Sequence, residues 1–168
     1  MKIFLVGMPG SGKSTLGRQL SDELSIPFVD LDEEIETREG QAIKDIFALH
    51  GEDYFRLVES ELLRQLATSP ESLVLSTGGG APCFYEGMQI LNENGLTIFL
   101  NVSEQKLMKR LQKSKDRPLL DRDEENKQRR VSEMLTARLP IYLKAKLVVT
   151  DPDVNRVLKA IRERGAAY

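Results

Sequence analysis

Short apolar runs alternate along the chain with segments whose apolar residues recur every three or four positions. The runs are rich in β-branched residues, and they occupy positions 3–6, 27–31, 73–76, 97–100 and 147–150. Because each run is continuous rather than alternately apolar and polar, it is typical of a parallel strand buried on both faces. The helical spacing is clearest at Leu16, Leu20 and Leu24. This order predicts an α/β fold, with a five-stranded parallel sheet flanked by helices on both faces.

Two stretches interrupt the regular alternation of strand and helix. Residues 33–66 add a helical insertion between the second and third predicted strands. Residues 113–126 are polar, highly charged and broken by Pro118, and they lie between two helical patterns. We expect 113–126 to form a lid loop on the nucleotide side, with a merely solvated loop as the alternative. No repeat or linker divides the chain, so 1–168 is predicted to be a single domain.

The most specific motif is Gly-Met-Pro-Gly-Ser-Gly-Lys-Ser-Thr at positions 7–15, between the first apolar run and a helical pattern. It matches the phosphate-binding loop, or P-loop, in its required strand–loop–helix context. Glycines let backbone N–H groups come close to phosphate oxygens, and the following helix adds N–H groups at its positive end. Lys13 is expected to reach the β- and γ-phosphates, and the Ser14 hydroxyl to bind Mg²⁺. The chain is therefore predicted to bind a nucleoside triphosphate.

Composition and charge narrow the class of protein. The chain has 168 residues, a net charge of −2, one histidine and one cysteine. This balance argues against nucleic acid as a bulk partner, and we expect neither a signal peptide nor a membrane span. The lone Cys83 excludes an internal disulfide, which favours a reducing cytoplasm. Cys83 is expected to be a small buried hydrophobe, and His50 a helix-end residue beside Gly51.

Two carboxylates stand near the end of the second predicted strand, in Asp30-Leu31-Asp32. Because strand side chains alternate, both would lie on one face of the sheet. Beside a phosphate loop, one carboxylate can complete a magnesium shell while the other orients an acceptor hydroxyl. The alternative is an exposed acidic pair or a helix cap, since Asp32 precedes a helical pattern.

Arginines and a run of glycines supply the remaining candidate groups. The planar guanidinium of Arg56 suits a carboxylate or phosphate, although a surface ion pair with Glu59 would also explain it. Three consecutive glycines at 78–80 follow a strand and offer backbone N–H groups to an anion, with a flexible turn as the alternative. Arg117 lies in the candidate lid, where closure would bring its charge to the transferring phosphoryl group. Arg138 ends a helical pattern, a position that needs no function to explain it.

Five blocks of sequence together resemble the shikimate kinase family, over nearly the whole chain. The blocks are Asp30-Leu31-Asp32; Ile46-Phe47 with Gly51-Glu52 and Phe55-Arg56; Ser76-Thr77-Gly78-Gly79-Gly80; Arg117-Pro118-Leu119-Leu120; and Arg138-Leu139-Pro140-Ile141-Tyr142. The resemblance implies a P-loop kinase that transfers the γ-phosphoryl group of ATP to the 3-hydroxyl of shikimate. The products would be shikimate 3-phosphate and ADP, in the synthesis of chorismate and the aromatic amino acids.

The resemblance also implies roles for individual residues. Asp32 would hold and polarise the acceptor hydroxyl, and Lys13 and Arg117 would stabilise charge on the phosphoryl group. Shikimate would be bound by Asp32, Arg56, Arg138 and the Gly79 N–H. Ser14 would ligate Mg²⁺, and Asp30 would reach the ion through water. The nucleotide contacts would be Gly10, Ser11, Gly12, Lys13, Ser14, Thr15 and Arg117. Residues 33–66 would form the substrate-binding region, and the enzyme would act as a monomer.

Two other functions compete with this interpretation. A different small-molecule kinase, acting on gluconate or on a nucleoside monophosphate, would share the phosphate loop. The arginine pattern favours a carboxylate over a second nucleotide. A nucleotide-binding module without catalysis is the other alternative, and the joint presence of Lys13, Ser14, Asp32 and Arg117 argues against it.

Overall fold

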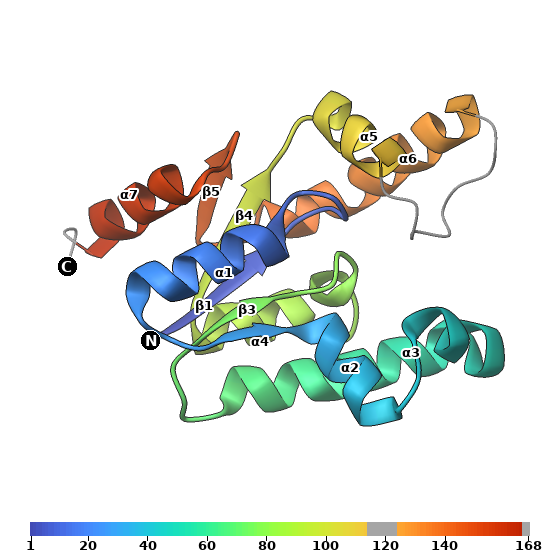
Figure 1. Cartoon of the computed structure of the whole chain (residues 1–168), viewed down its shortest axis with the longest axis horizontal. Coiled ribbons are helices and arrows are strands. Elements are labelled where there is room, and N and C mark those ends of the chain that lie inside the picture. Colours follow the sequence, from blue (N-terminus) through green and yellow to red (C-terminus); the bar gives the residue numbers. More distant parts are fainter. Residues whose placement is uncertain (114–123, 166–168) are drawn as a thin grey trace.

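A computed structural model describes residues 1–113 and 124–165 of the chain (Figure 1). The strands are β1 (Lys2–Val6), β2 (Phe28–Asp30), β3 (Leu73–Ser76), β4 (Leu96–Asn101) and β5 (Leu147–Thr150). The helices are α1 (Lys13–Leu24), α2 (Leu31–Glu39), α3 (Ile43–Thr68), α4 (Gly87–Asn94), α5 (Glu104–Lys113), α6 (Glu124–Tyr142) and α7 (Val154–Gly165), with a 3₁₀ helix η1 (Ala81–Cys83). None of the helices in these two ranges is both long and apolar enough to cross a membrane.

The five strands form one parallel sheet in the order β2-β3-β1-β4-β5. The predicted α/β fold and strand positions are confirmed, with small shifts at strand ends. One of these shifts bears on the site: β2 ends at Asp30 instead of residue 31. It ends there because the Asp30 carboxylate accepts hydrogen bonds from the backbone N–H groups of Asp32 and Glu33, which starts α2.

Two apolar layers cover the two faces of the sheet. Side chains of β1 alternate between them: Ile3 and Leu5 face α1 and α7, whereas Phe4 and Val6 face α3, α4 and α6. All four side chains are fully buried, as expected for the central strand of a doubly covered sheet. The sheet is thus held rigidly from both sides, and the loops at its edge are positioned by a packed core.

Helix α3 contains a break near its first third. Gly51 has φ 82° and ψ 174°, far from helical values, so the chain turns there between two helical segments. His50 stands at the end of the first segment, as predicted, and its ring lies 4.5 Å from that of Tyr54. The second segment carries the buried residues Phe55, Val58 and Glu59 toward the sheet.

Candidate active site

The candidate residues gather at the carboxyl edge of the sheet, where the connections after β1 and β3 diverge. The loop after β1 leads to α1 on one face, while the turn after β3 leads through η1 to α4 on the other (Figure 1). In open α/β sheets, this point of divergence is where ligands bind. The phosphate loop, Asp30 and the three glycines at 78–80 therefore lie at the same edge of the sheet.

The phosphate loop has the backbone that its glycines permit. Gly7, Gly10 and Gly12 have φ values of 148°, 81° and 88°, which side chains would strain. No side chain caps the first turn of α1, so its backbone N–H groups are positioned to meet an anion. The amine of Lys13 donates to the carbonyls of Gly7 and Met8, both at 2.9 Å. The loop is thus a preformed cradle with the lysine folded along it.

Helix α5 packs against this loop through Arg110. The Arg110 guanidinium donates a 3.0 Å hydrogen bond to the Gly10 carbonyl. A β-carbon added at Gly12 would lie 3.6 Å from the same guanidinium. Arg110 therefore stands at the outer side of the phosphate loop.

Three oxygen-bearing side chains meet beside the start of α1. The Ser14 hydroxyl lies 2.5 Å from a carboxylate oxygen of Asp30 and 3.2 Å from the Ser76 hydroxyl. These groups come from α1, β2 and β3. Hydroxyl and carboxylate oxygens are the ligands that Mg²⁺ prefers. In the described part of the chain no three His, Cys, Asp or Glu side chains cluster as a metal site.

The predicted placement of Asp30 and Asp32 on one strand face is wrong. Asp30 ends β2, but Asp32 already belongs to the first turn of α2. The helix cap that the sequence offered as an alternative does exist, yet the capping residue is Asp30 rather than Asp32. Because the chain turns at Asp30, the two carboxylates serve different places: one lies beside Ser14, the other beside the glycine turn.

The three glycines at 78–80 make room for charged side chains. A β-carbon added at Gly78 would lie 2.9 Å from a carboxylate oxygen of Glu59 and 3.1 Å from one of Asp32. One added at Gly79 would lie 3.0 Å from the Arg138 guanidinium, and one at Gly80 would lie 2.6 Å from a nitrogen of Arg56. None of the three has a positive φ, so space rather than backbone conformation requires glycine.

This turn, with the four side chains Asp32, Arg56, Glu59 and Arg138 around it, is called here the acid pocket. Arg56 and Arg138 approach the turn from different helices, α3 and α6, yet both reach it. Two guanidinium groups and two carboxylates around one small turn bring strong donors and strong acceptors together. Such a set can hold a small ligand that carries both an acid group and hydroxyl groups.

Arg56 forms the predicted ion pair with Glu59, but the pair is buried rather than on the surface. The two groups are 2.7 Å apart, and their side chains are only 11% and 3% exposed. Phe84 lies under the guanidinium, 4.3 Å from it. Breaking a buried pair leaves an uncompensated charge. Glu59 therefore fixes the orientation of Arg56, a role that the spacing along the helix could not separate from a surface pair.

Burial also shifts the titration of Glu59. It raises the pKa of this carboxyl above its ordinary value of 4.5, and the nearby charge of Asp32 raises it further, while Arg56 and Arg138 lower it. The folded state then holds the proton to higher pH than the unfolded chain does. The stability that this proton contributes is fully present below the unfolded value and is lost as pH rises through the folded pKa.

A Glu59→Gln variant should expose this linkage. The free energy of unfolding of the wild type, minus that of the variant, should decrease as pH rises from about 4.5. Urea unfolding of both proteins between pH 4.5 and 8 measures the difference. Glu61→Gln is the matched control, because Glu61 is half exposed and pairs with Arg38 at the surface. If the free energies of unfolding of the wild type and of Glu59→Gln changed in parallel with pH, the raised pKa of Glu59 would be contradicted.

Helix α6 runs further than the sequence suggested. Arg138 was expected near the helix end, but α6 continues through Pro140 to Tyr142. The extra turn is held from outside the helix, because the Tyr142 hydroxyl donates a 2.6 Å hydrogen bond to the Gly79 carbonyl. Tyr142 therefore lies near the site, although the sequence analysis quoted it only as part of a block and gave it no role.

Other predicted residues lie elsewhere or outside the described ranges. Arg117, and with it residues 114–123 of the predicted lid, is outside the described residues. Cys83 belongs to η1 and is only partly buried, although it packs on the core as a small hydrophobe would. Burial raises the pKa of its thiol.

Comparison with known proteins decides between the remaining functions. The family model described as shikimate kinase matches residues 9–164. The chain belongs to the shikimate kinase family. The predicted family, the P-loop kinase fold and an ATP-dependent kinase acting on shikimate are thereby confirmed. The gluconate-like, nucleotide-acceptor and non-catalytic alternatives are set aside.

Individual members of the shikimate kinase family agree with this chain over nearly their whole length. The shikimate kinase of Parabacteroides distasonis is 39% identical over an alignment of 168 positions, which covers 95% of this chain and 96% of that protein. The crystal structure of the Bacteroides thetaiotaomicron enzyme superposes with a TM-score of 0.88 at 35% identity, covering 99% and 97% of the two chains. A structure of the Acinetobacter baumannii enzyme, in complex with shikimate, superposes with a TM-score of 0.87 at 34% identity. The match covers 99% of this chain and 93% of that one.

Proposed function

We propose that the acid pocket of this shikimate kinase binds the shikimate carboxylate through Arg56, Arg138 and the Gly79 N–H. The supporting observation is that both guanidinium groups reach the same glycine turn. Arg56 is oriented by the buried Glu59, so the direction of its planar set of N–H donors is fixed before substrate arrives. If the two arginines lay on opposite sides of the molecule, they could not bind one carboxylate together.

Asp32 is proposed to orient the 3-hydroxyl of shikimate and to accept its proton during transfer. A carboxylate that contacts the nucleophilic hydroxyl raises its reactivity and receives the proton as the new P–O bond forms. Asp32 is supported by its position, since its carboxylate lies beside Gly78 on the acid pocket. The ring of shikimate then spans from the arginines to Asp32, and the hydroxyl points toward the phosphate loop.

The phosphate loop is proposed to hold ATP through Gly10, Ser11, Gly12, Lys13, Ser14 and Thr15. Lys13 neutralises charge on the β- and γ-phosphates, and it is placed by the same loop carbonyls that it contacts in this structure. Arg117 is proposed to add a second positive charge. Phosphoryl transfer needs little covalent help from protein groups, so positioning and charge neutralisation supply most of the rate.

Magnesium is proposed to bind at Ser14 and Asp30. The chemistry of the oxygen donors beside Ser14 fits this ion, whose shell is usually completed by phosphate oxygens and water. When bound, Mg²⁺ neutralises phosphate charge and fixes the phosphate geometry. Ser14 and Asp30 would hold the ion; their short mutual contact fixes the two side chains, and Asp30 is also held as the cap of α2.

The remaining expectations from the sequence are part of the same proposal. Residues 1–168 act as a single domain, with 33–66 as the substrate-binding region and 113–126 as a lid that excludes water. The enzyme works as a cytoplasmic monomer and does not bind nucleic acid. Size-exclusion chromatography with light scattering would test the monomer directly.

Replacing Arg138 tests the acid pocket. Arg138→Ala should raise the KM for shikimate roughly 10- to 100-fold, because a hydrogen bond between charged groups contributes about 1.5–3 kcal/mol. The KM for ATP should change less than about threefold, since the phosphate loop is left intact. Initial rates with each substrate varied in turn give both constants.

Arg129→Ala is the matched control for this experiment. Arg129 lies on the same helix but is 72% exposed and pairs with Glu133 at the surface, so neither constant should change. Equal increases in both KM values for Arg138→Ala would point to misfolding or another role. An unchanged KM for shikimate would overturn the proposed binding of its carboxylate.

A further inference from the structure

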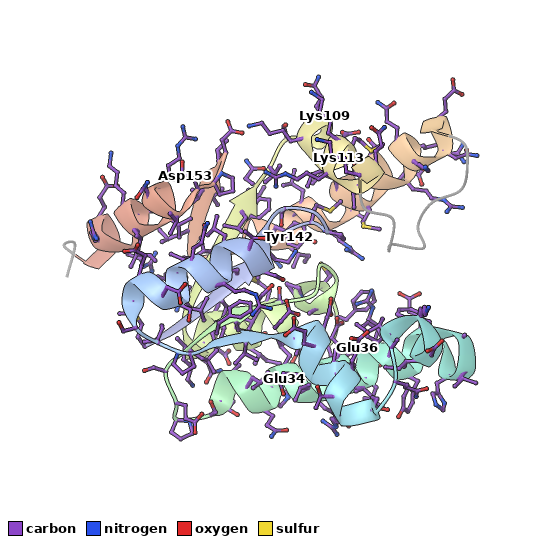
Figure 2. All side chains as sticks on the ribbon, in the orientation of Figure 1. Glu34, Glu36, Lys109, Lys113, Tyr142 and Asp153 are labelled. Carbon is purple, nitrogen blue, oxygen red and sulfur yellow. The ribbon has the colours of Figure 1, made fainter. Side chains whose placement is uncertain are left out.

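Tyr142 is a buried side chain to which the mechanism above gives no task. It ends α6, about one helical turn after Arg138. Its side chain is fully buried, and Figure 2 shows it in the interior of the molecule. The ring of Phe99, on β4, stacks on it with a centroid distance of 5.1 Å. The central sheet therefore sets the position of the Tyr142 hydroxyl.

This hydroxyl lies between the two loops that border the site. It donates a 2.6 Å hydrogen bond to the Gly79 carbonyl, and it is 4.0 Å from the Met8 sulfur in the phosphate loop. The neighbouring Pro9 also touches the turn, because a β-carbon added at Gly79 would lie 2.8 Å from its ring. Burial raises the pKa of the Tyr142 phenol to about 12, so it remains a neutral donor at physiological pH.

The hydrogen bond from Tyr142 to the Gly79 carbonyl also fixes the direction of the N–H group in the same peptide unit, that of Gly80. A trans peptide unit is planar, and its C=O and N–H point in opposite directions; the described residues contain no cis peptide. Holding the Gly79 carbonyl toward Tyr142 therefore aims the Gly80 N–H away from it. The guanidinium of Arg56 packs directly on Gly80, so the same peptide also affects how Arg56 sits.

We propose that Tyr142 is a positioning residue for recognition of the substrate's acid group, a role that rests on the proposed function. It fixes the Gly79–Gly80 peptide against the last turn of α6, which directly follows Arg138. The two guanidinium groups and the backbone of Gly79 then keep one mutual spacing. A small displacement of these groups weakens binding strongly, because each group must meet the same carboxylate at hydrogen-bond distance.

The test replaces the hydroxyl and keeps the ring. Tyr142→Phe retains the stacking on Phe99 but leaves the Gly79 carbonyl without its donor. The KM for shikimate should rise about tenfold through lost alignment. The kcat and the KM for ATP should stay within about twofold. Steady-state kinetics with each substrate varied give this split, and thermal unfolding shows that the variant is folded.

Ser21→Ala is a matched control for the loss of one hydroxyl. The Ser21 hydroxyl also donates a 2.6 Å hydrogen bond to a backbone carbonyl, that of Ile26, at the end of α1 remote from the phosphate loop. Both variants should lose a similar part of their thermal stability. Only Tyr142→Phe should change the KM for shikimate, which a merely structural role would not do.

The double variant with Arg138→Ala separates the possible outcomes. If Tyr142 acts by aligning the acid-binding groups, Tyr142→Phe should have a smaller effect on the KM for shikimate once Arg138 is absent. Equal effects in both backgrounds, equal increases in both KM values, or an unchanged KM for shikimate would each overturn the positioning role. If Arg138→Ala alone leaves that KM unchanged, the proposed function fails and this inference fails with it.

Discussion

Asp32→Asn should lower kcat by a factor of about 10² to 10⁴, the usual contribution of a positioned proton acceptor. The amide keeps the shape of the carboxylate but cannot take the proton of the acceptor hydroxyl. ATP binding should stay within about threefold, because Asp32 belongs to the acid pocket and not to the phosphate loop. Single-turnover rates and a nucleotide-binding titration, made on the same preparation, measure the two quantities.

Asp32→Asn should be no less stable toward unfolding than the wild type. Asp32 raises the pKa of the buried Glu59, so removing its charge relieves a repulsion between like charges. Glu33→Gln is the matched control: it makes the same chemical change at the next position, where the carboxylate is 64% exposed and pairs with Arg18. Normal turnover of Asp32→Asn would exclude Asp32 from activating the acceptor.

Lys13→Met should lower kcat/KM for ATP by about 10² to 10³, the range measured when a preorganised group that stabilises transition-state charge is removed. Methionine has a similar length but no charge, and it cannot donate to the carbonyls of Gly7 and Met8. The KM for shikimate should change little, because the acid pocket is formed by other elements. Initial rates over a range of ATP concentrations give the effect.

Lys2→Met provides the control for a lost lysine. The amine of Lys2 donates a 2.6 Å hydrogen bond to the Ala67 carbonyl, and Lys2 lies at the start of β1, opposite the phosphate loop. Its replacement should cost some stability and leave turnover intact. A similar loss of activity in both variants would mean that Lys13 acts through the stability of the fold rather than on phosphate charge.

Much of the fold could be predicted because its determinants are local. A continuous apolar run such as that of β3 is typical of a buried strand, and the spacing of Leu16, Leu20 and Leu24 is typical of a helix with one buried face. The phosphate loop is equally local, since its glycines, lysine and serine are neighbours in the chain. Order and handedness of the connections then leave few ways to arrange five parallel strands.

The predictions from the sequence were wrong where one side chain changes the path of the backbone. The Asp30 carboxylate ends β2 by capping α2, which moves Asp32 off the strand. Tyr142 extends α6 beyond Arg138 through a bond to Gly79, which lies 63 positions away in sequence. Neither effect follows from periodicity, because each depends on where a distant or adjacent backbone group happens to lie.

The sequence by itself determined the class of fold, the nucleotide cradle and the set of residue types available for an acid substrate. Only the tertiary structure decided that Arg56 is held in a buried pair with Glu59, and that Gly78, Gly79 and Gly80 are needed for space. The physical reason is that burial and close approach are properties of packing between α2, α3, α6 and the turn after β3. Segments far apart in the chain set those distances together, and no single segment encodes them.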